Sequence, residues 1–265
     1  MQELLTEYIS GILSGSGNTS DQLLITKLYN YSMNNTVYGY TYAESERGSL
    51  TGDGKTWEKS QHLSHNSDGI VLYGRGVCSA FAEFVNAYAS LAESEGITNT
   101  LRAVSCTGLN HEWNAVGLDT GTENEYWYYM DLSNRTYLIG YENERLSQNP
   151  AMFSYDPELS KNEDGTYTVT IGNGESVNIE SEDMLLPDTR GDVNGDLAAD
   201  LDDASAILTI YACNGAGLDS GFSDEQLTAA DVNEDGVITL DDASAVLSYY
   251  ARKGAGLGTD WDEII

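Results

Sequence analysis

A duplication near the C-terminal end constrains this chain more than any other feature of its sequence. Residues 192–212 align without gaps with residues 231–251, at an offset of 39 residues, and 13 of the 21 aligned positions are identical. Each copy starts with a run of Asp and Asn residues and continues into a stretch with helical apolar spacing. The repeat predicts two copies of one small loop-and-helix unit.

Oxygen-bearing side chains recur at fixed positions of the two copies. They occupy positions 1, 3, 5, 9 and 12 of each loop, and position 7 offers a backbone carbonyl. Ca²⁺ binds about six to eight oxygen ligands, and this spacing is that of the EF-hand loop. We therefore expect two Ca²⁺ ions, one in each loop. The expected ligands are Asp192, Asn194, Asp196, Ala198, Asp200 and Asp203 in the first loop, and Asp231, Asn233, Asp235, Val237, Thr239 and Asp242 in the second.

The two loops differ at the sharp turn. Gly236 stands there in the second loop and Leu197 in the first, where a residue with a side chain strains the backbone, so weaker binding is expected at the first site. Helices are expected over 204–212 and 243–251, with no full helix in front of either loop, so the copies are half EF-hands. Ser223 and Gln226 predict a short capped helix between them.

Two half EF-hands in tandem resemble a type I dockerin. The Asp-Ala-Ser-Ala run that follows each loop is similar to dockerins of ruminal fibre-degrading bacteria, and the resemblance covers roughly residues 190–258. It implies an all-α module that docks onto a cohesin of a cellulosomal scaffoldin, and hence secretion. Such dockerins use the loop positions that are occupied here by Leu201, Asp202, Leu240 and Asp241. The alternative is that both calcium loops serve stability alone.

Cys78 lies where a glycine turn meets a predicted helix. Gly74 and Gly76 end any helix or strand that the preceding residues form. Apolar residues then recur with helical spacing from Phe81 to Ala92. The first turn of a helix carries free N–H groups and a partial positive charge. Both favour a thiolate, which a nucleophilic cysteine needs, and the same N–H groups can stabilise an oxyanion.

His111 and Asp131 lie at the ends of predicted strands. His111 follows the strand 100–106 and the turn at Gly108, and Asp131 ends the aromatic strand 126–130. Adjacent antiparallel strands could bring the two side chains together and direct the imidazole at the helix of Cys78. A base that a carboxylate orients against a nucleophile is the arrangement of a catalytic triad.

The segments around these three residues resemble the transglutaminase-like superfamily of papain-like fold. They read Gly76-Val77-Cys78-x-x-Phe81-Ala82, His111-Glu112-Trp113-Asn114 and Trp127-Tyr128-x-x-Asp131. The resemblance covers roughly residues 20–140 and implies Cys78 as nucleophile, His111 as base and Asp131 as the orienting group. Glu112 departs from the pattern, because the family usually has a small residue there, and no side-chain oxyanion donor is identified.

Several functions stay open at this point. A peptidase is favoured for the N-terminal domain, with acyl transfer to amines as an alternative and a non-catalytic binding module that kept the papain-like fold as another. Buried structural roles for Cys78 and His111 and a turn role for Asp131 are the simpler alternatives at each position. His62 and His65 are spaced as a metal pair could be, but no further Cys or His lies nearby in the sequence.

Composition limits the classes of partner. The 265 residues carry a formal net charge of −31, which disfavours nucleic acid and anionic membranes. No apolar run is long enough to predict a transmembrane helix, and the N-terminal residues do not read as a signal peptide. Because a dockerin implies secretion, we expect that a signal has been removed rather than that the enzyme is intracellular. Three cysteines indicate no disulfide framework.

The predicted organisation is therefore two domains of an α+β chain. Residues 1–188 form the transglutaminase-like, papain-like domain, and residues 189–265 the dockerin. Residues 44–60 are expected to form a polar surface loop. A strand pair is predicted over 166–171 and 176–179, joined by a Gly-Asn-Gly turn. Whether residues 150–188 complete the catalytic domain or act as a linker stays open.

Overall fold

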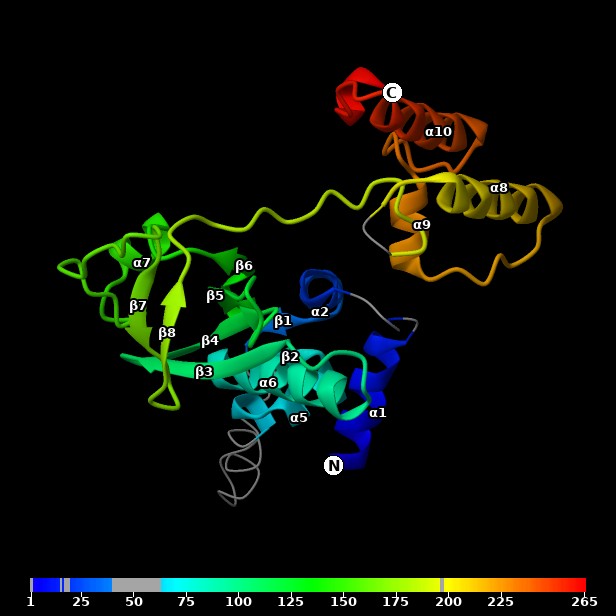
Figure 1. Cartoon of the computed structure of the whole chain (residues 1–265). Coiled ribbons are helices and arrows are strands. Elements are labelled where there is room, and N and C mark those ends of the chain that lie inside the picture. Colours follow the sequence, from blue (N-terminus) through cyan, green and yellow to red (C-terminus); the bar gives the residue numbers. More distant parts are fainter. Residues whose placement is uncertain (1, 15, 17–19, 40–62, 196–197) are drawn as a thin grey trace, which may run out of the picture. The chain divides into compact units, whose positions relative to one another are not determined.

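The computed structural model describes residues 2–14, 16, 20–39, 63–195 and 198–265 (Figure 1). The chain divides into two compact units, Met1–Leu186 (unit 1) and Pro187–Ile265 (unit 2), close to the domain boundary expected from the sequence. The predicted loop over 44–60, His62, Asp196 and Leu197 lie outside the described residues.

The helices of unit 1 begin where the sequence supplies a cap or a turn. Ser20 accepts a hydrogen bond from the backbone N–H of Leu23 at 3.3 Å, which satisfies one of the free donors of the next helix. Gly74 ends another helix in the left-handed conformation, with φ of 61°. The helical elements of unit 1 are α1 (Gln2–Leu13), α2 (Asp21–Asn35), α5 (Ser67–Tyr73), α6 (Cys78–Ser94), the 3-10 helix η1 (Leu132–Asn134) and α7 (Glu144–Gln148).

A six-stranded sheet forms the other half of unit 1. Its strands are β3 (Arg102–Gly108), β4 (His111–Leu118), β5 (Tyr126–Asp131), β6 (Thr136–Ile139), β7 (Tyr167–Thr170) and β8 (Ser176–Ile179). The order is β3-β4-β5-β8-β7, and β6 also pairs with β5. The pairs are antiparallel except for β5 and β8, which run parallel with Trp127 opposite Ile179. Two short strands, β1 (Val37–Tyr38) and β2 (Arg75–Gly76), form a separate parallel pair.

The predicted hairpin over 166–179 therefore belongs to the sheet of unit 1. Strand β8 joins it to β5, and the backbone N–H of Glu180 donates to the carbonyl of Trp127 at 2.9 Å. Segment 150–160 also packs on this sheet, through Phe153. The open question about residues 150–188 is thus resolved in favour of the N-terminal unit up to Leu186.

The sheet has a core on each face. Val116 and Leu118 of β4 pack with α6 and α2 in the helix-side core, which also contains Phe84 and Tyr88. Trp113 and Ala115 of the same strand belong to the far-side core, together with residues of β5, β7, β8 and segment 150–160. Alternate residues of a strand point to opposite faces, so β4 separates the two cores. Figure 1 shows α6 lying along one face of the sheet.

Unit 2 is built from the duplicated sequence. Its elements are α8 (Leu201–Ala216), α9 (Asp224–Ala230), α10 (Leu240–Gly254) and the 3-10 helix η2 (Trp261–Glu263). Ser223 and Gln226 form the predicted capping box of α9, and equivalent boxes start α8 and α10. Ile207, Ile210, Val232 and Val246 fill its core.

The mixed α+β class expected from the sequence is confirmed. In the part of the chain that the structure describes, no helix is both long and apolar enough to cross a membrane.

Candidate functional site

Cys78 is the first residue of α6, as its sequence context predicts. Val77 precedes it in an extended conformation and provides no side-chain cap, so the first N–H groups of the helix remain available near the sulfur. Gly76 lies so close to Ala80 that a Cβ on it would come within 2.6 Å of the Ala80 Cβ. Any residue larger than glycine would therefore push the chain away from the start of α6.

His111 is the first residue of β4, directly after a two-residue turn in which Asn110 adopts a left-handed φ of 56°. Its side chain is buried, with a relative exposure of 6%. The ring stacks on Trp113 with centroids 6.0 Å apart, and the edge of Phe153 approaches it at 5.3 Å. Two aromatic residues therefore fix the orientation of the imidazole.

Asp131 is the last residue of β5 and accepts four hydrogen bonds. His111 Nε2 lies 2.7 Å from its Oδ2, and Asn134 Nδ2 donates to the same oxygen at 2.7 Å. The other oxygen accepts from Ser133 Oγ at 2.6 Å and from the backbone N–H of Asn134 at 3.2 Å. Burial raises the pKa of the Asp131 carboxyl, but the hydrogen bonds from His111, Ser133 and Asn134 outweigh it and lower the pKa, so the carboxylate stays ionised.

His111 also faces the thiol of Cys78, and the interaction between them shifts the pKa of both groups. Because Nε2 is bonded to Asp131, we assign Nδ1 as the nitrogen that faces the sulfur. Residues from α6, β4 and β5 thus form one series of interacting side chains, from Asp131 through His111 to Cys78.

The charges in this chain favour an ion pair between Cys78 and His111. The hydrogen bond from His111 lowers the pKa of the Cys78 thiol against the opposing effect of burial, and the backbone N–H groups of Glu112 and Ser79 lower it further. Burial lowers the pKa of His111, but the hydrogen bonds with Asp131 and Cys78 outweigh it and raise the pKa to about 9. At neutral pH this arrangement favours a thiolate beside an imidazolium, which is the reactive form of a nucleophilic cysteine.

The sequence did not reveal the residues that support the triad. Ser133 and Asn134 hold Asp131, and Phe153 reaches His111 from a segment far along the chain. Ser133 and Asn134, two and three residues after Asp131, were a usable signal, because an Asp followed closely by Ser and Asn is typical of a turn in which the carboxylate caps the next backbone N–H groups. Nothing local in the sequence points from Phe153 to His111.

The loops of unit 2 are held together by their last residue. Asp242 is fully buried, and its Oδ1 accepts from the backbone N–H groups of Val232 and Asn233 while its Oδ2 accepts from that of Thr239 at 2.8 Å. Asp203, also fully buried, makes the equivalent bonds in the first copy, to the backbone N–H groups of Val193, Asn194 and Asp200. Each carboxylate therefore joins the two ends of its own loop.

The expected donor set of the second loop fits calcium in its chemistry, because all of its atoms are hard oxygens. Gly236 has a φ of 83°, the left-handed conformation expected at the sharp turn. Among the described residues, no three His, Cys, Asp or Glu side chains form a group that could hold a metal ion. Asp196, an expected ligand of the first loop, lies outside the described residues. Calcium binding therefore stays a prediction.

Unit 2 also exposes the same apolar side chains in both copies. Leu201, Leu208 and Tyr211 of α8 are between 40% and 51% exposed, and their equivalents on α10 are between 43% and 50% exposed. A spacing of seven and then three residues places each set on one side of its helix. We call these the paired stripes: Leu201, Leu208 and Tyr211, with Leu240, Leu247 and Tyr250.

Comparison with known proteins adds nothing to this description. No family model, curated protein or solved structure matches this chain. The chemistry of the two sites is therefore inferred from their residues and contacts alone.

Proposed function

We propose that unit 1 is a thiol hydrolase of the transglutaminase-like, papain-like class that cleaves peptide amide bonds through Cys78, His111 and Asp131. The main support for this proposal is the 2.7 Å hydrogen bond between His111 and Asp131, together with the interaction of His111 with the Cys78 thiol. A chain of nucleophile, base and orienting carboxylate is the arrangement that acyl transfer requires.

The reaction would begin with attack of the Cys78 thiolate on the carbonyl carbon of the amide. The carbonyl electrons move to oxygen, and backbone N–H groups at the start of α6 can stabilise the resulting charge. As the C–N bond breaks, His111 donates its proton to the leaving amine, which leaves a thioester on Cys78. His111 then accepts a proton from water, whose oxygen attacks the thioester, and release of the acid restores the thiolate and the imidazolium.

Acyl transfer to an amine is the alternative for the second half of the reaction. If a primary amine rather than water attacks the thioester, the product is a new amide and the protein acts as a transglutaminase. A binding module without catalysis is the alternative from another class. The perturbed pKa values of Cys78 and His111 favour catalysis, because a binding role does not require a reactive thiolate.

One incubation separates these functions. The wild type and Cys78→Ala are each mixed with casein and a labelled primary amine, and the products are read by mass spectrometry. Cleavage that Cys78→Ala abolishes supports the peptidase, whereas amine incorporation that it abolishes supports the transferase. Cys213→Ala is the matched control, because this partly exposed thiol lies in unit 2. If Cys78→Ala retains the activity of the wild type, the thiol mechanism is wrong.

We also propose that unit 2 is a type I dockerin that anchors the chain to a cohesin of a scaffoldin, which makes the protein a secreted component of a cellulosome. The paired stripes favour this second function. Exposed apolar side chains gathered on one surface mark a site for a protein partner, and here the gathering is repeated in both copies. Two equivalent surfaces would allow a cohesin to bind in two orientations.

Calcium would be held by the two loops. In the second loop the donors would be the side chains of Asp231, Asn233, Asp235, Thr239 and Asp242 with the carbonyl of Val237. The ion would supply charge neutralisation and cross-linking of the loop, since unit 2 carries 16 acidic and 2 basic residues from Gly191 onwards.

Substitutions on the paired stripes test the docking proposal in the full chain, with a panel of type I cohesin modules and isothermal titration calorimetry. If both orientations are used, Leu208→Asp or Leu247→Asp alone weakens binding only about twofold. The double variant should weaken it about a hundredfold or more, because charge then enters both apolar surfaces. Leu218→Asp with Leu257→Asp is the matched control, since these equivalent leucines are exposed beyond the two helices. Equal binding by both double variants would contradict the proposal.

A further inference from the structure

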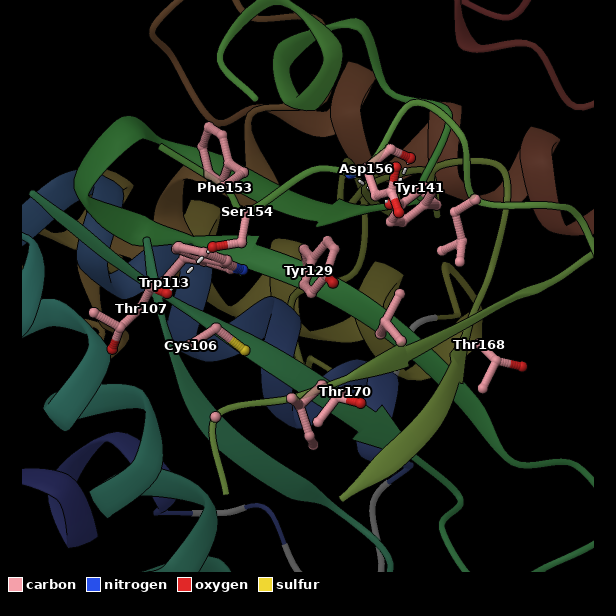
Figure 2. A pocket seen from close by; sticks show the side chains of 14 residues that line it. Cys106, Thr107, Trp113, Tyr129, Tyr141, Phe153, Ser154, Asp156, Thr168 and Thr170 are labelled. Carbon is pink, nitrogen blue, oxygen red and sulfur yellow. Dashed lines mark hydrogen bonds between the residues drawn. The ribbon is translucent and has the colours of Figure 1, made fainter. Parts of the chain in front are cut away.

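A pocket of about 360 Å³ lies on the far-side face of the sheet in unit 1 (Figure 2). Strands β3, β4, β5 and β7 and segment 153–159 contribute its walls, so none of it is formed by the helix α6 that carries Cys78. We call it the Trp113 pocket. Its volume falls within the range of about 300 to 1,000 Å³ that is usual for small-molecule sites. Trp113 and Phe153 contribute to its walls and also contact His111.

The indole nitrogen of Trp113 is a buried donor in this pocket. The side chain is 3% exposed, and within the described part of the chain no hydrogen-bond partner reaches its Nε1. Figure 2 shows this nitrogen at the end of the indole that faces Tyr129. The other buried indole of the sheet, that of Trp127, has an acceptor, because its Nε1 donates to Glu125 at 2.7 Å. A buried N–H without an acceptor destabilises a protein, so a carbonyl oxygen that reaches Trp113 Nε1 as the neighbouring rings shift would be bound favourably.

The walls of the pocket are aromatic and largely uncharged. Tyr129 and Phe153 meet the Trp113 ring edge-on at 6.1 and 5.3 Å. Burial raises the pKa of the Tyr129 hydroxyl and that of the Cys106 thiol, so both groups are neutral at physiological pH. Among the residues that line the pocket, Asp156 brings the only carboxylate and no residue brings a basic group. The described lining residues therefore offer no positive charge to a bound anion and one carboxylate to a bound cation.

We propose that the Trp113 pocket binds an uncharged molecule that combines an aromatic body with a carbonyl oxygen, and that this oxygen accepts a hydrogen bond from Trp113 Nε1. The rings of Trp113, Tyr129 and Phe153 supply the surface for the aromatic body, and the indole N–H fixes its orientation. The pocket also carries hydroxyl groups on Thr107, Ser154, Thr168 and Thr170, so a sugar is the competing ligand, and the test includes one.

The test uses the full chain with ¹⁵N-labelled tryptophan and follows the indole N–H resonances by NMR, after standard triple-resonance assignment. Acetophenone is the probe, ethylbenzene is the matched molecule without the oxygen, and methyl β-glucoside is the sugar. The expected result is a saturable downfield shift of the Trp113 resonance with acetophenone, a weaker affinity for ethylbenzene by about fivefold, and no saturation with the glucoside. Occupancy should also slow the alkylation of Cys106, which lines the pocket.

Trp113→Phe keeps an aromatic ring and removes the donor, so it should bind acetophenone about fivefold more weakly and ethylbenzene unchanged. If this variant does not fold, the affinities of the wild type for acetophenone and ethylbenzene still show whether the carbonyl oxygen contributes to binding. The proposal is overturned if acetophenone gives no saturable shift at Trp113, if both aromatic probes bind equally well, or if only the glucoside saturates.

Discussion

The two units build their candidate sites in opposite ways. In unit 1 the candidate residues come from three elements, α6, β4 and β5, and the interactions between Asp131, His111 and Cys78 each join two of them. In unit 2 every bond of Asp242 stays within its own loop, from Val232 to Thr239, and the whole arrangement is repeated in the first copy. The first site depends on the fold around it, whereas the second is contained in a short stretch of chain.

This difference predicts whether a substitution affects chemistry or folding in each unit. A substitution of similar shape at Cys78, His111 or Asp131 should alter the proposed chemistry and leave the fold intact, because the two hydrophobic cores of unit 1 are formed by other residues. A change in a loop of unit 2 should unfold that unit and leave the chemistry of unit 1 intact. The predictions below test this contrast, and they run from the largest expected effect to the smallest.

Asp131→Asn should lower kcat/KM for amide cleavage about 10³-fold while the far-UV circular dichroism spectrum stays unchanged. The amide has the same shape as the carboxylate but cannot stabilise the imidazolium of His111. Asp119→Asn, on the exposed turn after β4, should stay within about twofold of the wild type and serves as control. A loss of folded protein in Asp131→Asn would mean that the triad carries structure as well.

The pH dependence of the same variant gives an independent test. His111 must be protonated to donate to the leaving amine, so wild-type activity should be lost as the pH rises through about 9. The hydrogen bond with Asp131 is one cause of the raised pKa of His111, so Asp131→Asn should move this loss of activity to lower pH. An unchanged upper limit would assign it to another group.

Removal of calcium should unfold unit 2 alone. At free calcium of about 100 to 1,000 times Kd, the ion would contribute roughly 3 to 4 kcal/mol to the stability of the unit. With EDTA we expect the helical circular dichroism signal to fall and Cys213 in α8 to be alkylated faster, while Cys78 keeps its rate. A spectrum that EDTA leaves unchanged would count against calcium loops in this chain.

Asp242→Ala should destabilise unit 2 by about 3 kcal/mol, since it removes a fully buried acceptor and leaves backbone N–H groups unpaired. The matched control is Asp241→Ala, whose side chain is exposed and which should cost less than about 0.5 kcal/mol. Thermal unfolding followed at 222 nm measures both. Equal stability of the two variants would show that the bonds of Asp242 do not hold the loop.

Asn134→Ala should have the smallest effect, a loss in kcat of about tenfold with little change in KM. Asn134 donates to the oxygen of Asp131 that also bonds His111, so its loss loosens the orientation of the base. Ser133→Ala, which removes one of the two hydrogen bonds to the other oxygen, should cost less. A rise in KM without a change in kcat would assign Asn134 to substrate binding.

The sequence predicted local structure well. The start of α6 at Cys78, the strand ends at His111 and Asp131, and the capping box at Ser223 and Gln226 all depend on residues within a few positions of each other. The spacing of apolar residues and the turn and cap residues contain this information directly.

Long-range contacts could not be predicted in this way. The parallel pairing of β8 with β5, the packing of Phe153 against His111 and the unpaired Trp113 Nε1 each depend on how distant segments meet. The residue pattern of one segment does not specify which distant segment it contacts, because many strands with the same alternation of apolar and polar residues could pair with it. The residues that hold His111 and Asp131 in place were therefore found in the structure alone, while the grouping of Cys78, His111 and Asp131 was predicted and their catalytic role stays a prediction.

The pairing of β8 with β5 has a consequence for the time at which Cys78, His111 and Asp131 come together during synthesis. The ribosome makes Cys78, His111 and Asp131 well before it makes Ile179, the residue opposite Trp127 in the same strand as Asp131. Until then, β5 lacks this neighbour on the edge next to Trp127. A nascent chain that carries Cys78, His111 and Asp131 is thus still without a finished sheet, and this order of assembly would delay the final arrangement of the three side chains until unit 1 is nearly complete.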